Sequence, residues 1–425
     1  MDKRVWYSLY DRLLHEEALT TAFRKVKSAN GAPGIDGQSC KDFATKLSTN
    51  IHGLLTDLRM KIYRPSPVKR VEIAKPDGGI RKIGIPTVRD RVVQQALKNI
   101  LEPIFDPEFH PSSYGYRPGR GAHDAIAKAT AFMRDYHLEW VVDMDLSKCF
   151  DTLDHDLIIQ AVRERVADGS ILRLIRQFLE GGVLHSGDFE PTVVGSPQGG
   201  VISPLLANIY LDKFDQFMRS RGHRMTRYAD DIVIFKASKA GAENIRKTAT
   251  EYLEGCLKLT VNQRKTHVTS LTKGVPYLGV IIGKRYTRIK EERLKSFKEK
   301  VKSCTKRNSP VNLEKIIFDL NPILRGFAGY FKVANCKSVL QSEMAWIRRR
   351  LRSIQMKLWK KPRKLHRRLR QLGYTGEFKW IKMASWRNAA CQLSHWAMPN
   401  QWFDELGLYA MDKVETGVLP PINRG

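Results

Sequence analysis

Two apolar strands that end in carboxylates constrain this chain more than any other feature of its sequence. Tyr228-Ala-Asp-Asp231 precedes the apolar run Ile232–Phe235, so two aspartates stand where two apolar strands turn back on each other. Adjacent ionised carboxylates repel, and both lose hydration at such a turn. A divalent cation removes that penalty, and Mg²⁺ prefers oxygen ligands of this kind. An ordinary polar hairpin turn is the alternative interpretation of the Asp-Asp pair alone.

A second apolar strand, Trp140–Asp145, also ends in acid. Because side chains alternate along a strand, Asp143 and Asp145 share one face. If this strand lies beside the 228–235 hairpin, three carboxylates converge, which is the arrangement used for two-metal phosphoryl transfer. Spacing in the sequence leaves that convergence open.

The charge of the chain predicts its class of partner. The 425 residues include 73 Lys and Arg against 44 Asp and Glu, a formal net charge of +29, which indicates nucleic acid or an acidic membrane surface. No stretch approaches the roughly 18–20 apolar residues of a membrane span, and the longest apolar tract, Val201–Leu211, is interrupted by polar residues. Since the N-terminus also lacks an apolar signal core, we expect no membrane partner and a cytoplasmic protein, in the bacterial cytosol or nucleoid.

The order of the elements predicts two parts. Strand and helix signals interleave from about residue 30 to 285, which indicates one mixed α/β unit. Within it, Val68–Ile73 and Ile80–Ile85 form a predicted hairpin with a basic tip, and Pro276–Ile282 is the last predicted strand. After residue 286 strand signals stop, and helix and positive charge dominate.

One basic helix stands out in the second part. The segment Gln341–Arg370 carries twelve Lys and Arg against a single acid, Glu343. Spacings of 4, 3, 4, 3 and 4 predict one apolar stripe, formed by Leu340, Met344, Ile347, Leu351, Ile354 and Leu358. Off that stripe, on the surface expected to be exposed, fall Arg348, Arg349, Arg352 and Lys357. Six of the eight tryptophans also lie beyond residue 340, and cations beside rings are typical of RNA binding. A solvated helix face with tryptophans in the core is the alternative.

Seven short motifs occur in a characteristic order: Gly31–Gly37, Ile85–Arg91, Ser113–Asp124, Asp145–Asp151, Ser196–Pro204, Tyr228–Asp231 and Tyr277–Gly279. Together they resemble the reverse transcriptases encoded by bacterial and organellar group II introns. The YADD box is moderately specific by itself, and the SYGYRPGR and PQGGxxSP segments in this order make the resemblance highly specific. The basic region from about 290 to 375 resembles the family's thumb, also called maturase domain X.

The resemblance implies a role for each matching residue. Asp145, chosen over Asp143 because it lies five residues before Phe150, would ligate metal with Asp230 and Asp231, and the Leu146 carbonyl would be a further ligand. Phe150 would be the steric gate that selects deoxynucleotides. The remaining implied nucleotide contacts are Lys75 and Arg81 on the triphosphate, Gln198 in the nucleotide pocket, and Arg117, for which a salt bridge that holds the turn is an equally good interpretation.

Two further sets complete the implied sites. Tyr277, Leu278 and Gly279 resemble the primer grip. The predicted RNA-binding cations are Arg348, Arg349, Arg352, Lys357, Lys360, Lys361, Arg363 and Lys364.

The implied fold is an α/β (α+β) right-hand polymerase with fingers and palm, followed by an all-helical basic thumb. We expect an N-terminal helical extension at 1–30, fingers and palm at 31–285, the thumb or maturase domain X at 286–375, and at 376–425 a completion of the thumb or a small DNA-binding extension. Paired cysteines of an HNH-type endonuclease do not occur, so the chain resembles the short, endonuclease-less class.

The expected function is an RNA-directed DNA polymerase that uses two Mg²⁺ ions and dNTPs to copy an RNA template from a DNA primer. The resemblance also implies that it binds its own group II intron RNA, assists splicing and acts at target DNA. Alternatives are a domesticated relative in DNA repair or phage defence, and a splicing-only RNA-binding maturase. An RNA-dependent RNA polymerase is a more remote alternative that Phe150 disfavours.

Overall fold

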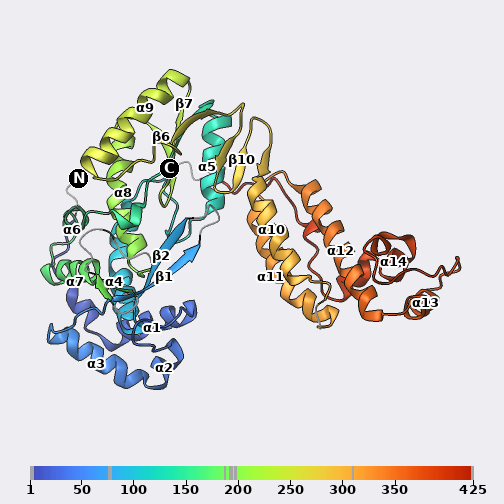
Figure 1. Cartoon of the computed structure of the whole chain (residues 1–425). Coiled ribbons are helices and arrows are strands. Elements are labelled where there is room, and N and C mark those ends of the chain that lie inside the picture. The colour runs from blue at the N-terminus through green and yellow to red at the C-terminus, as the bar shows by residue number, and fades with distance from the viewer. Residues whose placement is uncertain are drawn as a thin grey trace. The chain divides into compact units, whose positions relative to one another are not determined.

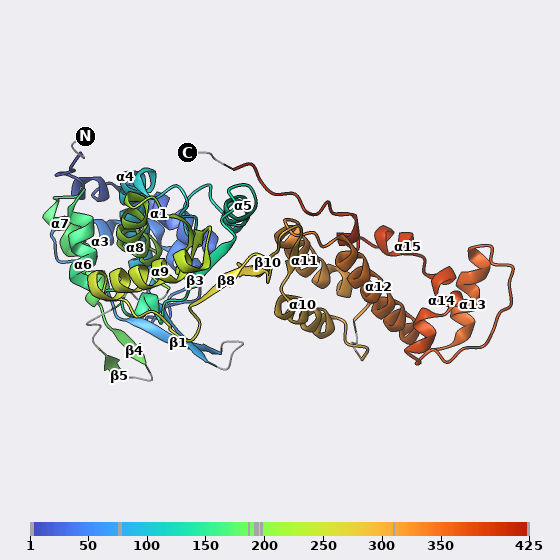
Figure 2. The same cartoon turned by 90° about the horizontal axis from the view of Figure 1, so that it is seen from above.

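The computed structural model of the chain describes residues 4–74, 79–185, 188–190, 195, 199–308 and 311–422. The chain divides into two compact units, the first running to Thr269 and the second spanning Ser270–Pro421. Figures 1 and 2 show both units from directions at right angles.

Two four-stranded sheets organise the first unit. One consists of β3 (Trp140–Met144), β6 (Arg224–Tyr228), β7 (Asp231–Lys236) and β8 (His267–Ser270), in the order β6-β7-β3-β8. The other consists of β1 (Val68–Ala74), β2 (Ile80–Ile85), β4 (Val183–His185) and β5 (Asp188–Glu190), in the order β2-β1-β4-β5. The β1–β2 pair confirms the hairpin predicted from the sequence.

Nine α-helices of the described residues accompany these sheets: α1 (Glu16–Ala29), α2 (Cys40–Thr45), α3 (Leu47–Arg59), α4 (Val88–Phe105), α5 (Ala122–Arg134), α6 (His155–Arg163), α7 (Gly169–Glu180), α8 (Ser203–Ser220) and α9 (Lys239–Glu251). Short helical turns lie at Tyr10–Leu13, Asp106–Glu108, Cys149–Asp151 and Tyr252–Cys256. The helix expected over residues 1–30 is therefore a short turn followed by α1, which ends where Asn30 adopts a left-handed conformation with φ 45°.

Polar caps fix where several of these helices begin. Thr87 accepts a hydrogen bond from the Asp90 amide at the start of α4, and Asp154 accepts one from Leu157 at the start of α6. Asp168 caps α7 and also accepts hydrogen bonds from the backbone amides of Leu9 and Tyr10, both at 2.8 Å. The N-terminal segment is thereby tied to α7.

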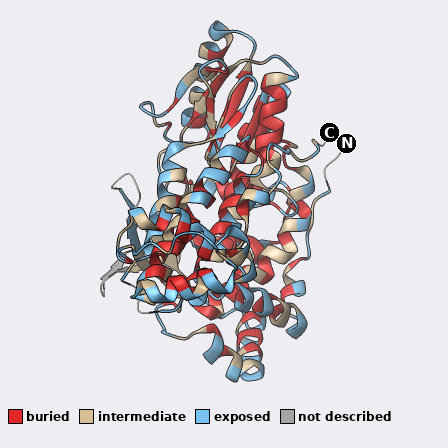
Figure 3. Cartoon of the chain, turned by 90° about the vertical axis from the view of Figure 1, so that its right-hand side faces the viewer, coloured by how far each residue is buried: buried red, intermediate tan, exposed pale blue. Residues whose placement is uncertain are grey.

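One hydrophobic core runs through the first unit. It joins residues of α1, α3, α4, α6, α7 and α8 to the inner side chains of β3, β6 and β7. In α5, which contacts β6 and β7, every residue from Ala125 to Met133 is buried. Figure 3 shows burial concentrated along the strands and the helix faces that cover them. The sheet that carries the acidic residues therefore stands on a rigid support.

The second unit opens with a small antiparallel sheet: β9 (Val275–Tyr277), β10 (Val280–Ile282) and β11 (Thr287–Ile289), in the order β11-β10-β9. The prediction of one strand over 276–282 was wrong, because Leu278 and Gly279 have positive φ values of 45° and 83° and form a two-residue hairpin turn. The structural division after Thr269 thus groups these strands with the helices that follow, whereas the expected boundary lies after residue 285.

Helices make up the rest of the second unit: α10 (Glu291–Cys304), α11 (Leu313–Phe331), α12 (Lys337–Trp359), α13 (Pro362–Gln371), α14 (Gln392–Ala397) and α15 (Asn400–Glu405), with short turns at Arg387–Ala390 and Met411–Lys413. Those two turns and α13 contact α12, so the segment after α13 folds back on that helix. None of the described helices is long and apolar enough to cross a membrane.

Candidate active site

The strand ends that carry Asp145, Asp230 and Asp231 meet at one edge of the β6-β7-β3-β8 sheet, which we call the acidic edge. The β6–β7 turn with Asp230 and Asp231 is called the acidic turn. Asp230 and Asp231 lie at the β6–β7 turn, and the antiparallel register places Met144 of β3 opposite Ile232 of β7. Asp145 follows Met144 and Asp231 precedes Ile232, so both aspartates reach the same edge of the sheet. The structure thus contains the convergence of strand ends that the spacing in sequence left open.

A loop far along the chain fixes Asp145. The side-chain amide of Asn262 donates to Asp145 Oδ2 at 2.9 Å, and the Asn262 backbone amide donates to the Asp145 carbonyl at 2.8 Å. The Asp145 amide in turn donates to Thr266 Oγ1 at 3.1 Å. Sequence analysis missed Asn262 and Thr266, because no local pattern connects them to a strand more than a hundred residues earlier.

The electrostatics of the turn disfavour a charged Asp230. Burial raises the pKa of Asp230 above its usual range, and the nearby negative charge of Asp145 raises it further. The positive charges of Arg81 and Arg227 act in the opposite direction. A cation held between Asp145 and Asp230 would relieve both the desolvation and the repulsion.

The oxygen ligands at this edge suit a hard divalent cation. In the described part of the chain, no three His, Cys, Asp or Glu side chains stand close enough to form a ready-made metal cluster. The side chains that reach this edge are carboxylates, and carboxylate oxygens fit Mg²⁺ by their chemistry. The Leu146 carbonyl stays a predicted ligand: the isolated bridge between Leu146 and Val261 uses the hydrogen bonds of the flanking residues and does not use that carbonyl.

The SYGYRPGR segment and the residue before it are hydrogen-bonded to β6 next to the β6–β7 turn. The Tyr114 amide donates to the Arg227 carbonyl and the Arg227 amide to the Ser112 carbonyl, both at 2.9 Å. A Cβ atom on Gly115 would overlap the backbone of Ala229, whose φ is 58°. Only glycine therefore permits this close approach to the acidic turn.

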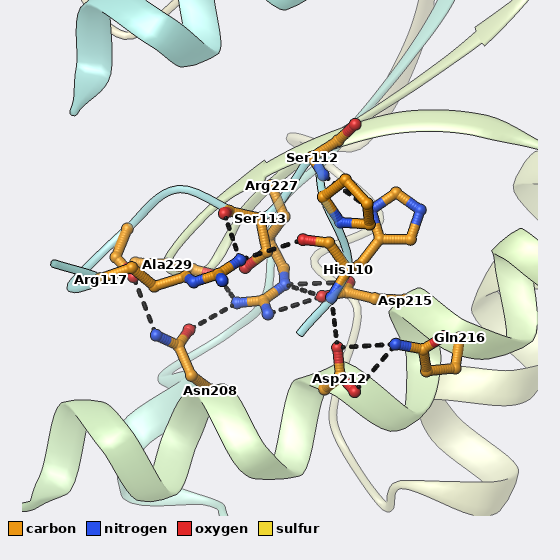
Figure 4. Close-up of polar contacts among 12 residues, drawn as sticks. His110, Ser112, Ser113, Arg117, Asn208, Asp212, Asp215, Gln216, Arg227 and Ala229 are labelled. Carbon is orange, nitrogen blue, oxygen red and sulfur yellow. Dashed lines mark hydrogen bonds and ion pairs between the residues drawn. The ribbon is translucent and has the colours of Figure 1, made fainter. Parts of the chain in front are cut away.

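Arg227, the residue before Tyr228, lies fully buried under the same turn (Figure 4). Its guanidinium donates to both carboxylate oxygens of Asp215 at 2.6–2.9 Å, to Oδ1 of Asn208 at 2.9 Å and to the carbonyl of Ala229 at 3.0 Å. The Asn208 side chain also donates to the Gly115 carbonyl at 2.8 Å. The Arg227 and Asn208 side chains together thus link α8, the SYGYRPGR segment and the acidic turn.

Burial and mutual attraction act against each other in the Arg227–Asp215 pair. Burial raises the pKa of Asp215, and the Arg227 charge opposes that rise. Burial alone lowers the pKa of Arg227, but the charge and hydrogen bonds of Asp215 raise it above its ordinary value. Sequence analysis missed both residues. Neither charge stands out in the sequence, because β6 also carries Arg224 and Thr226, and α8 also carries Asp212 and Lys213.

Arg117 belongs to this scaffold rather than to a nucleotide contact. Its side chain is only 2% exposed, and it pairs with Asp106 at 2.7 Å. Its other nitrogens donate to the carbonyls of Asp106, His110 and Ser113 at 2.6, 3.1 and 3.0 Å. The structure therefore favours the salt bridge that holds the turn over the predicted nucleotide contact, because each of the three guanidinium nitrogens already has a partner within the protein.

The predicted triphosphate contacts are only partly described. Arg81 is exposed on β2, and its charge acts on Asp230, so the hairpin and the acidic edge are electrostatically coupled. Lys75 and Gln198 lie outside the described residues. Just after Gln198, Gly199 has φ 121° and packs so tightly on the Gly84 carbonyl that a Cβ atom would overlap it. Gly199 therefore lies against the end of β2.

Phe150 sits in the short helix Cys149–Asp151, directly after the acidic strand end. Phe150 packs against the core of the first unit. Its ring also meets Tyr116, with ring centroids 6.3 Å apart and planes at 83°. Phe150 is therefore half-buried, with a ring from the SYGYRPGR segment against it.

The predicted primer grip forms the β9–β10 turn of the second unit. Tyr277 is buried, and the next two residues make the turn itself. The Leu278 carbonyl accepts a hydrogen bond from the Tyr330 hydroxyl at 2.8 Å, and the Gly279 carbonyl accepts one from the Lys290 amide at 3.1 Å. Tyr330 of α11 and Lys290, the residue that precedes α10, thus hold this turn.

Two of the predicted RNA-binding cations lie inside the second unit. Arg348 and Arg352 are only 5% and 2% exposed. Arg348 pairs with Asp412 at 2.8 Å, and Arg352 donates to the Met398 carbonyl at 2.9 Å. Their predicted place on the surface was wrong, because the segment after α13 covers this side of α12.

The other predicted cations remain accessible. Arg349 is half-buried, with its guanidinium 4.8 Å from the ring centre of Trp386. Exposed positions hold Lys357, Lys360, Lys361, Arg363 and Lys364. On the opposite side, the predicted apolar stripe is confirmed as buried at Leu340, Met344, Ile347, Leu351 and Ile354, while Leu358 is half-buried.

Two family models match the chain. The model described as reverse transcriptase (RNA-dependent DNA polymerase) matches residues 73–282, and the model described as group II intron, maturase-specific domain, matches residues 294–373. The first covers the acidic edge, β2 and the last two residues of β1, and the second covers α11, α12, α13 and most of α10.

Several curated proteins are similar in sequence. Protein YkfC of Escherichia coli K12 is 36% identical over 319 residues, covering 66% of this chain and 84% of that protein. Group II intron-encoded protein LtrA of Lactococcus lactis is 28% identical over 343 residues, covering 65% and 56%. The putative COX1/OXI3 intron 2 protein of Saccharomyces cerevisiae is 27% identical over 319 residues, covering 61% and 37%. The chain thus spans little more than half of LtrA.

Among solved structures, a chain of a partial Cas6-RT-Cas1–Cas2 complex matches 58% of this chain and 42% of its own. The match has a TM-score of 0.38 and 21% sequence identity.

Proposed function

We propose that this chain, which belongs to the group II intron reverse transcriptase and maturase family, is an RNA-directed DNA polymerase. It also binds intron RNA and assists the splicing of that RNA. The observation that carries the proposal is the register that brings Asp145 to the edge where Asp230 and Asp231 stand. A maturase-specific domain in the same chain supports the splicing role.

Each residue at or near the acidic edge would have a separate role in nucleotidyl transfer. Carboxylate oxygens of Asp145, Asp230 and Asp231 would hold two Mg²⁺ ions, which when bound neutralise charge on the reacting phosphate and its leaving group. Asn262 keeps the Asp145 carboxylate oriented toward this edge. Arg81 would bind the triphosphate of the incoming nucleotide, because an exposed guanidinium near the acidic edge can neutralise phosphate oxygens.

The partners are proposed from charge and family. A net charge of +29 and the exposed cations on and around α13 support binding to an RNA template, a DNA primer and target DNA. Phe150 would select dNTPs, because a ring beneath the sugar leaves no room for a 2′-hydroxyl.

Asp230→Ala tests the polymerase. It should abolish primer extension on an RNA template with dNTPs, because the acidic edge loses a central carboxylate. Asp135→Ala, at the exposed end of α5, is the matched control and should extend normally. Full extension by the Asp230→Ala protein would refute the assignment.

The same variant separates polymerisation from splicing. Splicing of a group II intron RNA by the Asp230→Ala protein should persist, because the acidic edge lies apart in sequence from the maturase-specific domain. Loss of splicing in a variant that remains folded would contradict independent roles.

Phe150→Ala tests nucleotide selection. The ratio of ribonucleotide to deoxynucleotide incorporation should rise severalfold when the ring is removed. An unchanged ratio would exclude Phe150 as the sugar-selecting residue.

A further inference from the structure

Tyr116 has an unusual backbone for a large side chain. Its φ is 59°, in the left-handed region that bulky residues avoid, and its side chain is nonetheless 54% exposed. Such strain persists only where the surroundings impose it, and it is most common at functional sites.

The neighbours of Tyr116 impose this conformation. On one side Gly115 lies against the Ala229 backbone, and its carbonyl accepts a hydrogen bond from Asn208. On the other side the buried Arg117 is anchored to Asp106. With both flanking residues fixed, Tyr116 keeps this conformation, and its side chain stays largely exposed.

The Tyr116 ring meets Phe150. The two ring planes stand at 83° with centroids 6.3 Å apart, which is the edge-to-face arrangement that aromatic pairs prefer. Phe150 also packs against the core of the first unit, so its ring has two supports, the core and Tyr116. The Phe150 ring thus has restricted freedom to tilt.

Tyr116 also stands beside the acidic edge. Burial raises the pKa of its hydroxyl, and the charge of Asp230 raises it further, so the side chain is neutral at physiological pH. A neutral ring next to these carboxylates can support an aromatic neighbour without competing for a cation.

We propose that Tyr116 is a positioning residue for sugar selection, which holds the Phe150 ring in the orientation that excludes a 2′-hydroxyl. The inference rests on the proposed function of Phe150. Because the contact is between rings, the Tyr116 hydroxyl is dispensable and the ring is not. Loss of an edge-to-face pair should reduce discrimination by roughly two- to tenfold.

Steady-state kinetics on one RNA template test this role. Tyr116→Ala should lower the ratio of kcat/KM for a dNTP to that for the matching rNTP, whereas Tyr116→Phe should retain it. Tyr116→Gly, which removes the ring and also relieves the backbone strain, should behave like Tyr116→Ala and guards against misfolding. Tyr136→Ala is the matched control, since Tyr136 is 53% exposed in the same unit, and it should leave the ratio unchanged.

A double-mutant cycle with Phe150→Ala completes the test. Adding Tyr116→Ala to Phe150→Ala should change the ratio no further, because the ring that Tyr116 supports is already gone. If Phe150→Ala changes the ratio but Tyr116→Ala and Tyr116→Gly do not, the role of Tyr116 is overturned while the gate stands. If Phe150→Ala itself changes nothing, the gate fails and the role of Tyr116 fails with it.

Discussion

At the scale of single residues, the buried Arg227–Asp215 pair affects both the stability of the protein and the position of the acidic turn. Arg227 binds Asp215, Asn208 and the Ala229 carbonyl, so the position of the turn depends on an ion pair without solvent contact. Such pairs contribute little net stability, yet removing one partner leaves the other charged and buried. The pair thus serves mainly to orient the turn.

Asp215→Asn should therefore destabilise the protein strongly. The Arg227 guanidinium would lose its counter-charge in a site without water, at a cost of about 3–5 kcal/mol in the free energy of unfolding. Urea denaturation of the first unit measures this. Asp156→Asn makes the same change in the exposed Arg176–Asp156 pair and should cost less than about 1 kcal/mol. Equal effects of the two variants would contradict the orienting role.

His110 should make stability depend on pH. Burial lowers the pKa of His110 from 6.5 to about 4, and the charge of Arg219 adds to that effect. Its Nδ1 accepts a hydrogen bond from the Ser112 amide at 3.0 Å, which fits a neutral ring. Below pH 6.5 the unfolded chain binds a proton that the folded protein excludes. The stability is therefore complete above pH 6.5 and is lost as the pH falls toward 4, by about 3 kcal/mol.

The variant His110→Asn checks this prediction. Asparagine keeps an acceptor for the Ser112 amide but cannot titrate, so the free energy of unfolding should depend less on pH between 6.5 and 4. His52→Asn, at an exposed position in α3, is the control and should keep the dependence of the parent protein. An unchanged slope in His110→Asn would assign the acid sensitivity to other groups.

At the scale of elements, α12 shows how one helix can bury two faces. Its apolar stripe packs into the second unit, while Arg348 and Arg352 on another side are covered by the segment after α13. Burial and the Arg348 charge lower the pKa of Arg352 to about 10, so it remains charged at neutral pH. These arginines hold the C-terminal segment on the helix, and the exposed cations are left for a polyanion.

Arg352→Met and Arg363→Met should separate these two roles. The first leaves the Met398 carbonyl and Asn400 without their donor and should cost about 1–3 kcal/mol of stability, with an unchanged salt dependence of RNA binding. The second removes an exposed cation of α13 and should leave stability within about 0.5 kcal/mol while lowering the salt slope by about one. Thermal melts and binding titrations at several salt concentrations measure both, and a reversed pattern would contradict this division.

At the scale of the whole molecule, the excess of positive charge sets the behaviour toward nucleic acid. If binding neutralises about six phosphates, RNA affinity should fall roughly a thousandfold or more between about 50 and 200 mM salt. Fluorescence anisotropy with a labelled intron RNA measures this. A nearly flat response would show that charge does not drive the interface.

Local patterns in the sequence predicted much of the framework. Alternation and apolar runs predicted β1, β2, β3 and the β6–β7 hairpin, because a half-buried strand must alternate or stay apolar wherever it lies. Helical spacing predicted the buried stripe of α12. The acidic turn could be predicted because two adjacent carboxylates at the end of a strand repel each other unless a cation binds them.

The structure alone decided what long-range contacts control. Asn262 holds Asp145 across more than a hundred residues, and Arg352 is buried only because a later segment folds over it. Arg117 had two equally good interpretations until its four donor contacts were known. Sequence determines which side chains can titrate, bind or pack through their local chemistry. Whether a cation faces water or a carboxylate is decided by tertiary neighbours, since burial depends on segments that no local pattern specifies.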